Sequence, residues 1–239
     1  MDNQNSSSRT YIQIALCFLV LYGLIHLGFY RTYFIHFPGF KPFQWMHHVH
    51  GFLMSTWILM LIIQPLLIGL GKRNMHHRVG KLSYIVAPLI ILSMFLITRM
   101  SYHKGIVSGS PREAIADQAL SLGQWCIFTC FYILAMVYRK QPERHMRYII
   151  GTGLLMVLPG LNRLLGTFFE VTSETGIFIS SMVTIGIALV LLTRDILKRR
   201  AWIPYTLIVF AYVGIYLLYA CRYSDLYQAI GNLIARTLP

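Results

Sequence analysis

Residues 50–65 read HGFLMSTWILMLIIQP, and after the opening histidine they contain no charged side chain. They form the centre of an apolar segment that extends from about residue 47 to residue 71. A helix needs about 20 mainly apolar residues to cross the hydrocarbon core of a bilayer. Because lipid offers no hydrogen-bond partner to free backbone groups, this segment is expected to be a membrane-spanning helix.

The same pattern recurs along the whole chain, which has 239 residues, of which 56% are hydrophobic and 12% charged. The apolar segments lie at about 11–35, 47–71, 80–101, 118–138, 146–168, 174–194 and 202–222. We therefore expect an all-α fold, a polytopic integral membrane bundle of seven transmembrane helices. Its seven-helix domain would occupy residues 11–222, between a polar cytoplasmic tail (1–10) and a short C-terminal interfacial segment (223–239).

The distribution of basic residues predicts how the chain is oriented in the membrane. The net charge is +13, and twelve of the 21 basic residues fall in alternate links between the apolar segments. These residues are Lys72, Arg73, Arg78, Lys81, Arg139, Lys140, Arg144, Arg147, Arg194, Lys198, Arg199 and Arg200. Positive charge concentrates on the cytoplasmic side of membrane proteins, so the N-terminus is expected in the cytoplasm and the C-terminus outside. This pattern predicts a lipid bilayer, rather than nucleic acid, as the partner of the basic residues.

Histidines gather where the apolar segments begin. Residues 46–51 read MHHVHG and residues 75–80 read MHHRVG, each directly before or within the start of an apolar run. With the predicted orientation, the outer group of histidines comprises His26, His36, His47, His48, His50 and His103. The inner group comprises His76, His77 and His145. The imidazoles are therefore expected near both membrane faces.

Helical spacing places some of these histidines on polar stripes. One stripe is formed by His50, Met54, Trp57, Leu61 and Gln64. A second is formed by His77, Tyr84, Pro88 and Ile91, and a third by His145, Ile149, Thr152, Met156, Pro159 and Arg163. Residues at such intervals share one helix face, and polar groups in a span usually face the bundle interior. We expect Pro88 and Pro159 to kink their helices.

Paired imidazoles on different helices can ligate haem iron axially, which makes haem b the first candidate cofactor. His77 and His145 would form an inner pair, and His50 would pair with His26 or His103 outside. Arg163 would neutralise a haem propionate or bind a quinone oxygen, and Gln64 is a further candidate contact of the cofactor. The chain would then pass electrons to or from a quinone or another membrane redox protein.

Other interpretations of the same residues stay open. The histidines could hydrogen-bond carbonyls and link helix ends in a cofactor-free accessory subunit or small-molecule transporter. Arg163 and Gln64 could bond carbonyls freed by Pro159 and Pro65. His47, His48 and His50 could bind copper or zinc, whose ligand preferences they suit. All eight acidic residues lie in tails, links or span ends and none inside a span, which counts against a proton- or sodium-coupled transporter.

Residues of about 45–165 resemble a family of bacterial predicted membrane proteins, domain-of-unknown-function family 2306. The resemblance is carried by His50-Gly51, Gln64, the stretch His77 to Lys81 with Tyr84, and His145-Met146-Arg147 with Arg163. Lys81 stands where that family often has arginine, and the third motif is compressed. The resemblance implies a bacterial inner membrane and a multi-pass protein, but no established activity.

The stretch from His50 to Pro65 is also similar to the opening of cytochrome b561-type helices. Proteins of that type use paired histidines to hold two b haems across the membrane, so the similarity implies His50 and His77 as ligands. Residues 118–138, the fourth apolar segment, contain no histidine. The helix pairing of that family is therefore not transferred as a whole.

Overall fold

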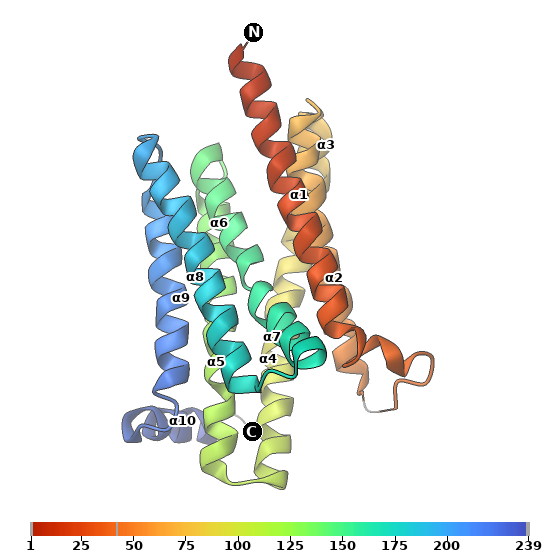
Figure 1. The fold of residues 1–239 in the computed structure, drawn as a ribbon, viewed down its shortest axis with the longest axis vertical. Coiled ribbons are helices and arrows are strands. Elements are labelled where there is room, and N and C mark those ends of the chain that lie inside the picture. The colour runs from red at the N-terminus through yellow and green to blue at the C-terminus, as the bar shows by residue number, and fades with distance from the viewer. Residues whose placement is uncertain (1, 42, 238–239) are drawn as a thin grey trace. The chain divides into compact units, whose positions relative to one another are not determined.

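The structure, a computed structural model, describes residues 2–41 and 43–237, with side chains described for 8–41 and 43–234. The described chain is all-α (Figure 1). Its elements in order are α1 (Asp2–Tyr30), η1 (Phe34–His36), α2 (Trp45–Gly69), α3 (Arg73–Gly80), α4 (Ser83–Ser108), α5 (Pro111–Val137), α6 (Pro142–Leu154), α7 (Val157–Phe169), α8 (Ser173–Leu197), α9 (Ile203–Ala220) and α10 (Asp225–Thr237).

Seven helical segments of the described chain are long and apolar enough to cross a membrane, which confirms the predicted fold class. They are Ser8–Tyr30, Trp45–Gly69, Arg73–Ser108, Pro111–Val137, Pro142–Phe169, Ser173–Leu197 and Ile203–Ala220. The chain is thus a polytopic membrane protein, and its orientation stays a prediction. Helix α1 already begins at Asp2, so helical backbone extends through most of the segment predicted as a polar tail.

The chain forms two compact units, which we describe separately. Unit 1 comprises Met1–Ile90 and Gly153–Ser180, and unit 2 comprises Ile91–Thr152 and Ser181–Pro239. Unit 1 therefore contains α1, α2, α3 and α7, whereas unit 2 contains α5, α9 and α10. Helices α4, α6 and α8 each contribute one part to either unit, and α6 belongs to unit 2 up to Thr152.

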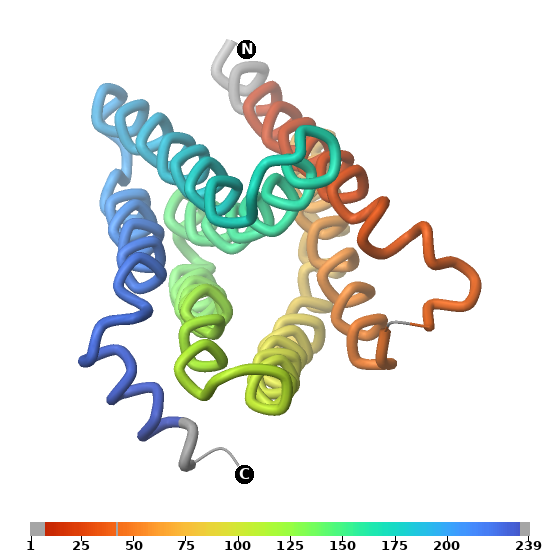
Figure 2. The backbone as a smooth tube through the Cα atoms, turned by 60° about the horizontal axis from the view of Figure 1, so that its bottom comes forward, coloured from red at the N-terminus to blue at the C-terminus, as the bar shows by residue number. Residues whose placement is uncertain are grey.

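In unit 1, α1 packs against both α2 and α7, as Figure 2 shows. Glycines permit these close crossings. A Cβ on Gly28 of α1 would overlap the backbone carbonyl of Gly160 in α7. Near the other end of α1, the Ser8 hydroxyl donates to the carbonyl of Gly69 in α2 (2.5 Å). Small residues at helix crossings let backbones approach closely, which is the main source of packing between helices in lipid.

The fifth span is broken into α6 and α7. Helix α6 ends at Leu154 and α7 begins at Val157, so Pro159 lies in the first turn of the second helix. Proline is tolerated there because the first amides of a helix have no intrahelical partner. The expected kink at this proline is therefore confirmed as a helix break. Around Pro88, by contrast, α4 stays a single helix.

In unit 2, α5 packs against α9, and the close approach again involves glycine. Gly123 of α5 lies against the Ile215 side chain, and a Cβ there would come within 3.0 Å of it. The buried Tyr212 hydroxyl of α9 donates to the Gly151 carbonyl (2.7 Å). Hydrogen bonds to backbone carbonyls satisfy such buried phenols without a second polar side chain.

The C-terminal segment forms helix α10, which lies across the end of α9 (Figure 1). Its Gln228 side chain donates to the carbonyls of Arg112 (3.1 Å) and Arg222 (2.8 Å), which attaches α10 to the start of α5. Four large apolar residues of this helix are exposed, namely Leu226, Ile230, Leu233 and Ile234. Contact of these residues with lipid stays a prediction.

The α1–α7 crossing generates a first prediction. Gly28→Ala should destabilise the protein by about 1–3 kcal/mol, because the new methyl group would overlap backbone rather than a movable side chain. The measurement is unfolding by SDS titration in mixed micelles. The matched control is Gly23→Ala on the same helix, where a Cβ meets no atom within 4 Å. Equal stability of the two variants would contradict the described crossing.

Candidate functional site

His26 of α1 uses one ring nitrogen in a hydrogen bond to its own helix. Its Nδ1–H donates to the carbonyl of Tyr22, one turn earlier (2.9 Å), because a carbonyl can only accept. The ring stacks on Phe34 with 5.3 Å between the centroids. This hydrogen bond selects the tautomer in which Nε2 carries a lone pair. His26 therefore has the protonation pattern of a metal or haem ligand.

His48 lies in an aromatic cluster formed by the segment between α1 and α2. The Tyr33 hydroxyl and Nδ1 of His48 are 2.5 Å apart. Burial raises the pKa of Tyr33, so the phenol is protonated at neutral pH and can donate to the imidazole. Phe40 and Phe43 contact the same imidazole edge-on. His48 is thus engaged in the packing of the cluster.

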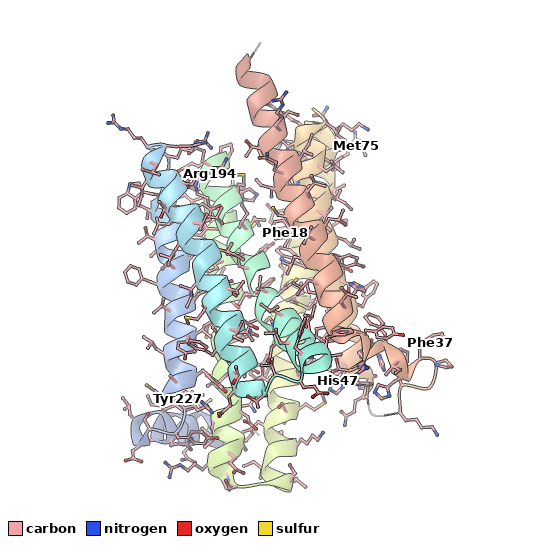
Figure 3. The ribbon with its side chains drawn as sticks, viewed as in Figure 1. Phe18, Phe37, His47, Met75, Arg194 and Tyr227 are labelled. Carbon is pink, nitrogen blue, oxygen red and sulfur yellow. The ribbon has the colours of Figure 1, made fainter. Side chains whose placement is uncertain are left out.

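The predicted copper or zinc ligands do not converge in the structure. Within the described residues, no group of three His, Cys, Asp or Glu side chains could hold a metal ion. His47 receives the backbone N–H of Gln44 on its Nδ1 atom (3.2 Å) and caps the start of α2. Figure 3 shows His47 at this end of the helix and Phe37 in the preceding segment. Metal binding by His47, His48 and His50 stays a prediction without geometric support.

His50 belongs to the buried stripe of α2. Met46 and Leu53, which precede and follow it by one turn, are buried, and Trp57 is only 2% exposed. Residues at these intervals share one helix face. The helix face that contains His50, Trp57 and Leu61 was predicted to point to the interior, and within unit 1 this face is buried.

Arg163 is held against α1 without a carboxylate. Its guanidinium carbon lies 4.3 Å from the centroid of the Phe29 ring, and Nη1 donates to the Pro159 carbonyl (3.2 Å). No described Asp or Glu forms a salt bridge with it. His26 precedes Phe29 by three residues and shares its helix face. The structure thus places the predicted outer residues His26 and Arg163 beside the same stretch of α1.

Gln64 connects α2 to α3. With its amide oxygen facing the Gly80 amide, it accepts from that N–H at 2.8 Å and donates to the His76 carbonyl at 3.1 Å. In the same orientation, the amide nitrogen also donates to Nδ1 of His76. Gln64 therefore ties the end of one span to the turn that begins the next. His77, the residue after His76, contacts the His76 ring edge-on, with 5.4 Å between the ring centroids.

His145 in unit 2 has the same tautomer as His26. It is half-buried, and its Nδ1–H donates to the carbonyl of Ala135 in α5 (2.8 Å). No hydrogen bond to its Nε2 atom occurs within the described residues. The fourth apolar segment, which contains no histidine, therefore contacts His145 through the backbone carbonyl of Ala135.

The predicted histidine pairs divide between the two units. His77 lies in unit 1 and His145 in unit 2, so their pairing stays a prediction. The same holds for His50 and His103, the latter an exposed residue of α4 in unit 2. Of the predicted pairs, His26 and His50 alone belong to one unit, on helices α1 and α2 that pack together.

Sequence reasoning missed a buried ion pair in unit 2. Arg147 of α6 is 1% exposed, and its Nε donates to the carboxylate of Asp195 near the end of α8. Its Nη1 donates to the Glu143 carbonyl (2.6 Å), and its guanidinium carbon lies 5.8 Å from the centroid of the Tyr205 ring. In the sequence, Asp195 is an acidic residue among the basic residues that follow the sixth apolar segment. No local pattern connects it to Arg147.

Comparisons with protein-family models, curated proteins and solved structures give no match for this chain. The resemblances to domain-of-unknown-function family 2306 and to cytochrome b561-type proteins therefore stay predictions carried by residues alone. What the structure supports directly is a seven-helix membrane protein.

The buried ion pair generates a second prediction. Asp195→Ala should lower the free energy of unfolding by about 3–5 kcal/mol, because it leaves the Arg147 charge buried and unpaired. The control is Glu143→Gln, whose side chain is 57% exposed and whose loss should cost less than about 1 kcal/mol. The double variant Arg147→Met with Asp195→Leu should recover much of the stability that Asp195→Ala loses. A similar loss in all three proteins would argue against a specific pair.

The connection made by Gln64 generates a third prediction. Gln64→Leu should destabilise the protein by about 1–3 kcal/mol and speed hydrogen exchange of the Gly80 amide, which loses the Gln64 oxygen as an acceptor. Exchange is followed by mass spectrometry of peptides that cover α3. The control is Gln13→Leu on α1, where the side chain is exposed. Unchanged exchange at Gly80 in Gln64→Leu would show that the amide has another partner.

Proposed function

We propose that this chain is an integral membrane haem-b protein that passes electrons to or from a quinone or another membrane redox protein. The proposal includes the predicted orientation, with the N-terminus cytoplasmic, in a bacterial inner membrane. The observation that carries it is the position of His145, whose Nδ1–H is held by the Ala135 carbonyl while Nε2 keeps its lone pair. Metal-bound histidines typically show this second hydrogen bond, which orients the ring and increases its basicity.

The donor set fits a bis-histidine haem at the level of individual ligands. His26 repeats the arrangement of His145, with its Nδ1–H on the Tyr22 carbonyl. His50 lies on the buried stripe of α2, the helix that packs against α1. The proposed ligands are His77 and His145 on the inner side, and His50 with His26 or His103 on the outer side. Haem b would supply one-electron redox chemistry at these positions.

Arg163 is suited to an anionic group at the outer end of unit 1. One of its five N–H donors is used by the Pro159 carbonyl, and its guanidinium lies over the Phe29 ring. A partly buried guanidinium without a carboxylate can be neutralised by a carboxylate from a ligand, such as a haem propionate, or can donate to a quinone oxygen. Arg163 and His26 lie beside the same stretch of α1, and this proximity supports a haem site at the outer side.

A second candidate function is favoured by the hydrogen bonds of the same residues. Gln64 bonds the His76 carbonyl and the Gly80 amide, and Arg163 bonds the Pro159 carbonyl. These contacts complete backbone hydrogen bonding inside single units, as expected of a cofactor-free accessory subunit or small-molecule transporter. In that case the histidines orient helices and no cofactor is present.

A fourth prediction separates the two candidates. The detergent-purified protein, expressed with ample haem supply, should show a Soret band that sharpens and shifts on reduction with dithionite. His145→Ala and His77→Ala should each remove the inner haem and lower the haem content to about half, because a bis-histidine iron needs both axial ligands. The measurement is the pyridine haemochrome absorbance per mole of protein.

His36→Ala is the matched control, because His36 is exposed in the segment between α1 and α2 and has no proposed role. It should leave the spectrum unchanged. A flat visible spectrum of the folded wild-type protein would remove the haem proposal and leave the cofactor-free function.

A further inference from the structure

A small pocket in unit 2 lies between α4, α5 and α10, and none of the proposed haem ligands belongs to its lining. Its volume is about 40 Å³. Arg99 contributes the one charged side chain of its lining, and Gln118 contributes an amide. Phe95, Ile115 and Leu122 supply apolar walls, and Tyr227 of α10 covers one side. The pocket therefore combines a few polar groups with an apolar surround, as small-molecule sites do.

Gln118 carries an acceptor that the described protein does not satisfy. The residue is 5% exposed, and its Nε2 donates to the Ala114 carbonyl (3.2 Å). That hydrogen bond sets the orientation of the amide, because the opposite orientation would bring two oxygens together. The Oε1 atom is buried and has no donor among the described residues. A buried acceptor without a donor is costly, so it indicates a missing partner group.

The chemistry of the lining selects that partner. The Gln118 Oε1 atom requires a hydrogen-bond donor, whereas the Arg99 guanidinium can only donate. A hydroxyl group donates one hydrogen bond and accepts others, so it matches both. A phosphate or an ionised carboxylate would direct further acceptor oxygens at the Gln118 oxygen. A hydrocarbon would leave the acceptor buried without a partner.

The size of the pocket agrees with a hydroxyl group. A site for one water-sized group needs only about 10–15 Å³ of space, so the pocket is large enough for a hydroxyl group. The apolar walls belong to α4 and α5, two helices that are long and apolar enough to cross a membrane, so the remainder of an amphipathic molecule could extend along them into lipid. Helix α10 is attached over this place, since the Tyr227 hydroxyl donates to the Ile115 carbonyl (3.5 Å) and Gly231 lies against the Ile115 side chain.

We propose that this pocket binds the hydroxyl group of a membrane-soluble alcohol, with Gln118 accepting its hydrogen bond and Arg99 donating to its oxygen. The site contains no histidine and requires no haem, so it is independent of the function proposed above. Water carries the same hydroxyl chemistry, and the experiment must distinguish these two sources.

The probe is 1-hexadecanol with a photoactivatable diazirine near the hydroxyl end, added to the full-length protein in lipid nanodiscs. Palmitic acid at pH 7.5 and hexadecane, each with a diazirine at the same position, serve as comparison probes. Labelled peptides are mapped by mass spectrometry. The alcohol should label residues 95–122 and 227–234 about fivefold or more above either comparison probe, the selectivity expected of one buried hydrogen bond.

Two variants test whether the labelling depends on the pocket. Gln118→Leu removes the acceptor and should reduce labelling by the alcohol to the level of the hydrocarbon probe. Its melting temperature should be equal or higher, since replacing an unsatisfied buried polar group by an apolar one costs little. Leu122→Trp fills the pocket and should block labelling with Gln118 still present. Gln124→Leu, on the same helix but outside the pocket, is the matched control and should label as the wild type does.

Equal labelling by the three probes would overturn the proposal, and so would alcohol labelling that persists in both Gln118→Leu and Leu122→Trp. Either result would leave water as the group that satisfies Gln118. A colourless protein with alcohol-selective labelling would reject the haem function while keeping this site.

Discussion

The structure depends on one constraint, which is that the hydrocarbon core of a membrane offers no hydrogen bonds. Each polar group inside a span must therefore find its partner in the protein. Thr56 donates to the Phe52 carbonyl on its own helix (2.8 Å), and Trp125 donates to the Ile91 carbonyl on a neighbouring one (3.0 Å). The same constraint explains why Gln64 reaches the next helix and why Arg147 is buried with Asp195. Gln118 is informative because its oxygen departs from this rule among the described residues.

The hydrocarbon surroundings also determine how the helices pack in each unit. Between helices in lipid there is little hydrophobic driving force, so close contact between backbones supplies the attraction. Glycine lies at the close approaches in both units, with Gly28 and Gly153 in unit 1 and Gly123 and Gly151 in unit 2. Close packing at these points holds the histidines of α1, α2 and α6 at defined positions, which any cofactor site would need.

Much of the fold was predictable because hydropathy and helical period are local properties of the sequence. The seven spans and the buried direction of the stripe containing His50 and Trp57 follow from them. The bond between Gln64 and Gly80 and the pairing of Arg147 with Asp195 depend on how separate helices meet, which no local pattern records. The tautomer of His145 was likewise hidden, because its partner is a backbone carbonyl ten residues away on α5.

The pairing of Arg147 with Asp195 also bears on the order in which the protein is made. Asp195 follows Arg147 by 48 residues, so the ribosome synthesises all of α7 and most of α8 after the arginine. Of the two carboxylates that pair with this guanidinium among the described residues, Glu143 lies one turn away on α6 and is made before Arg147. Burial of Arg147 with a full counter-charge therefore requires α8 to be in place, because the guanidinium would otherwise be buried without Asp195.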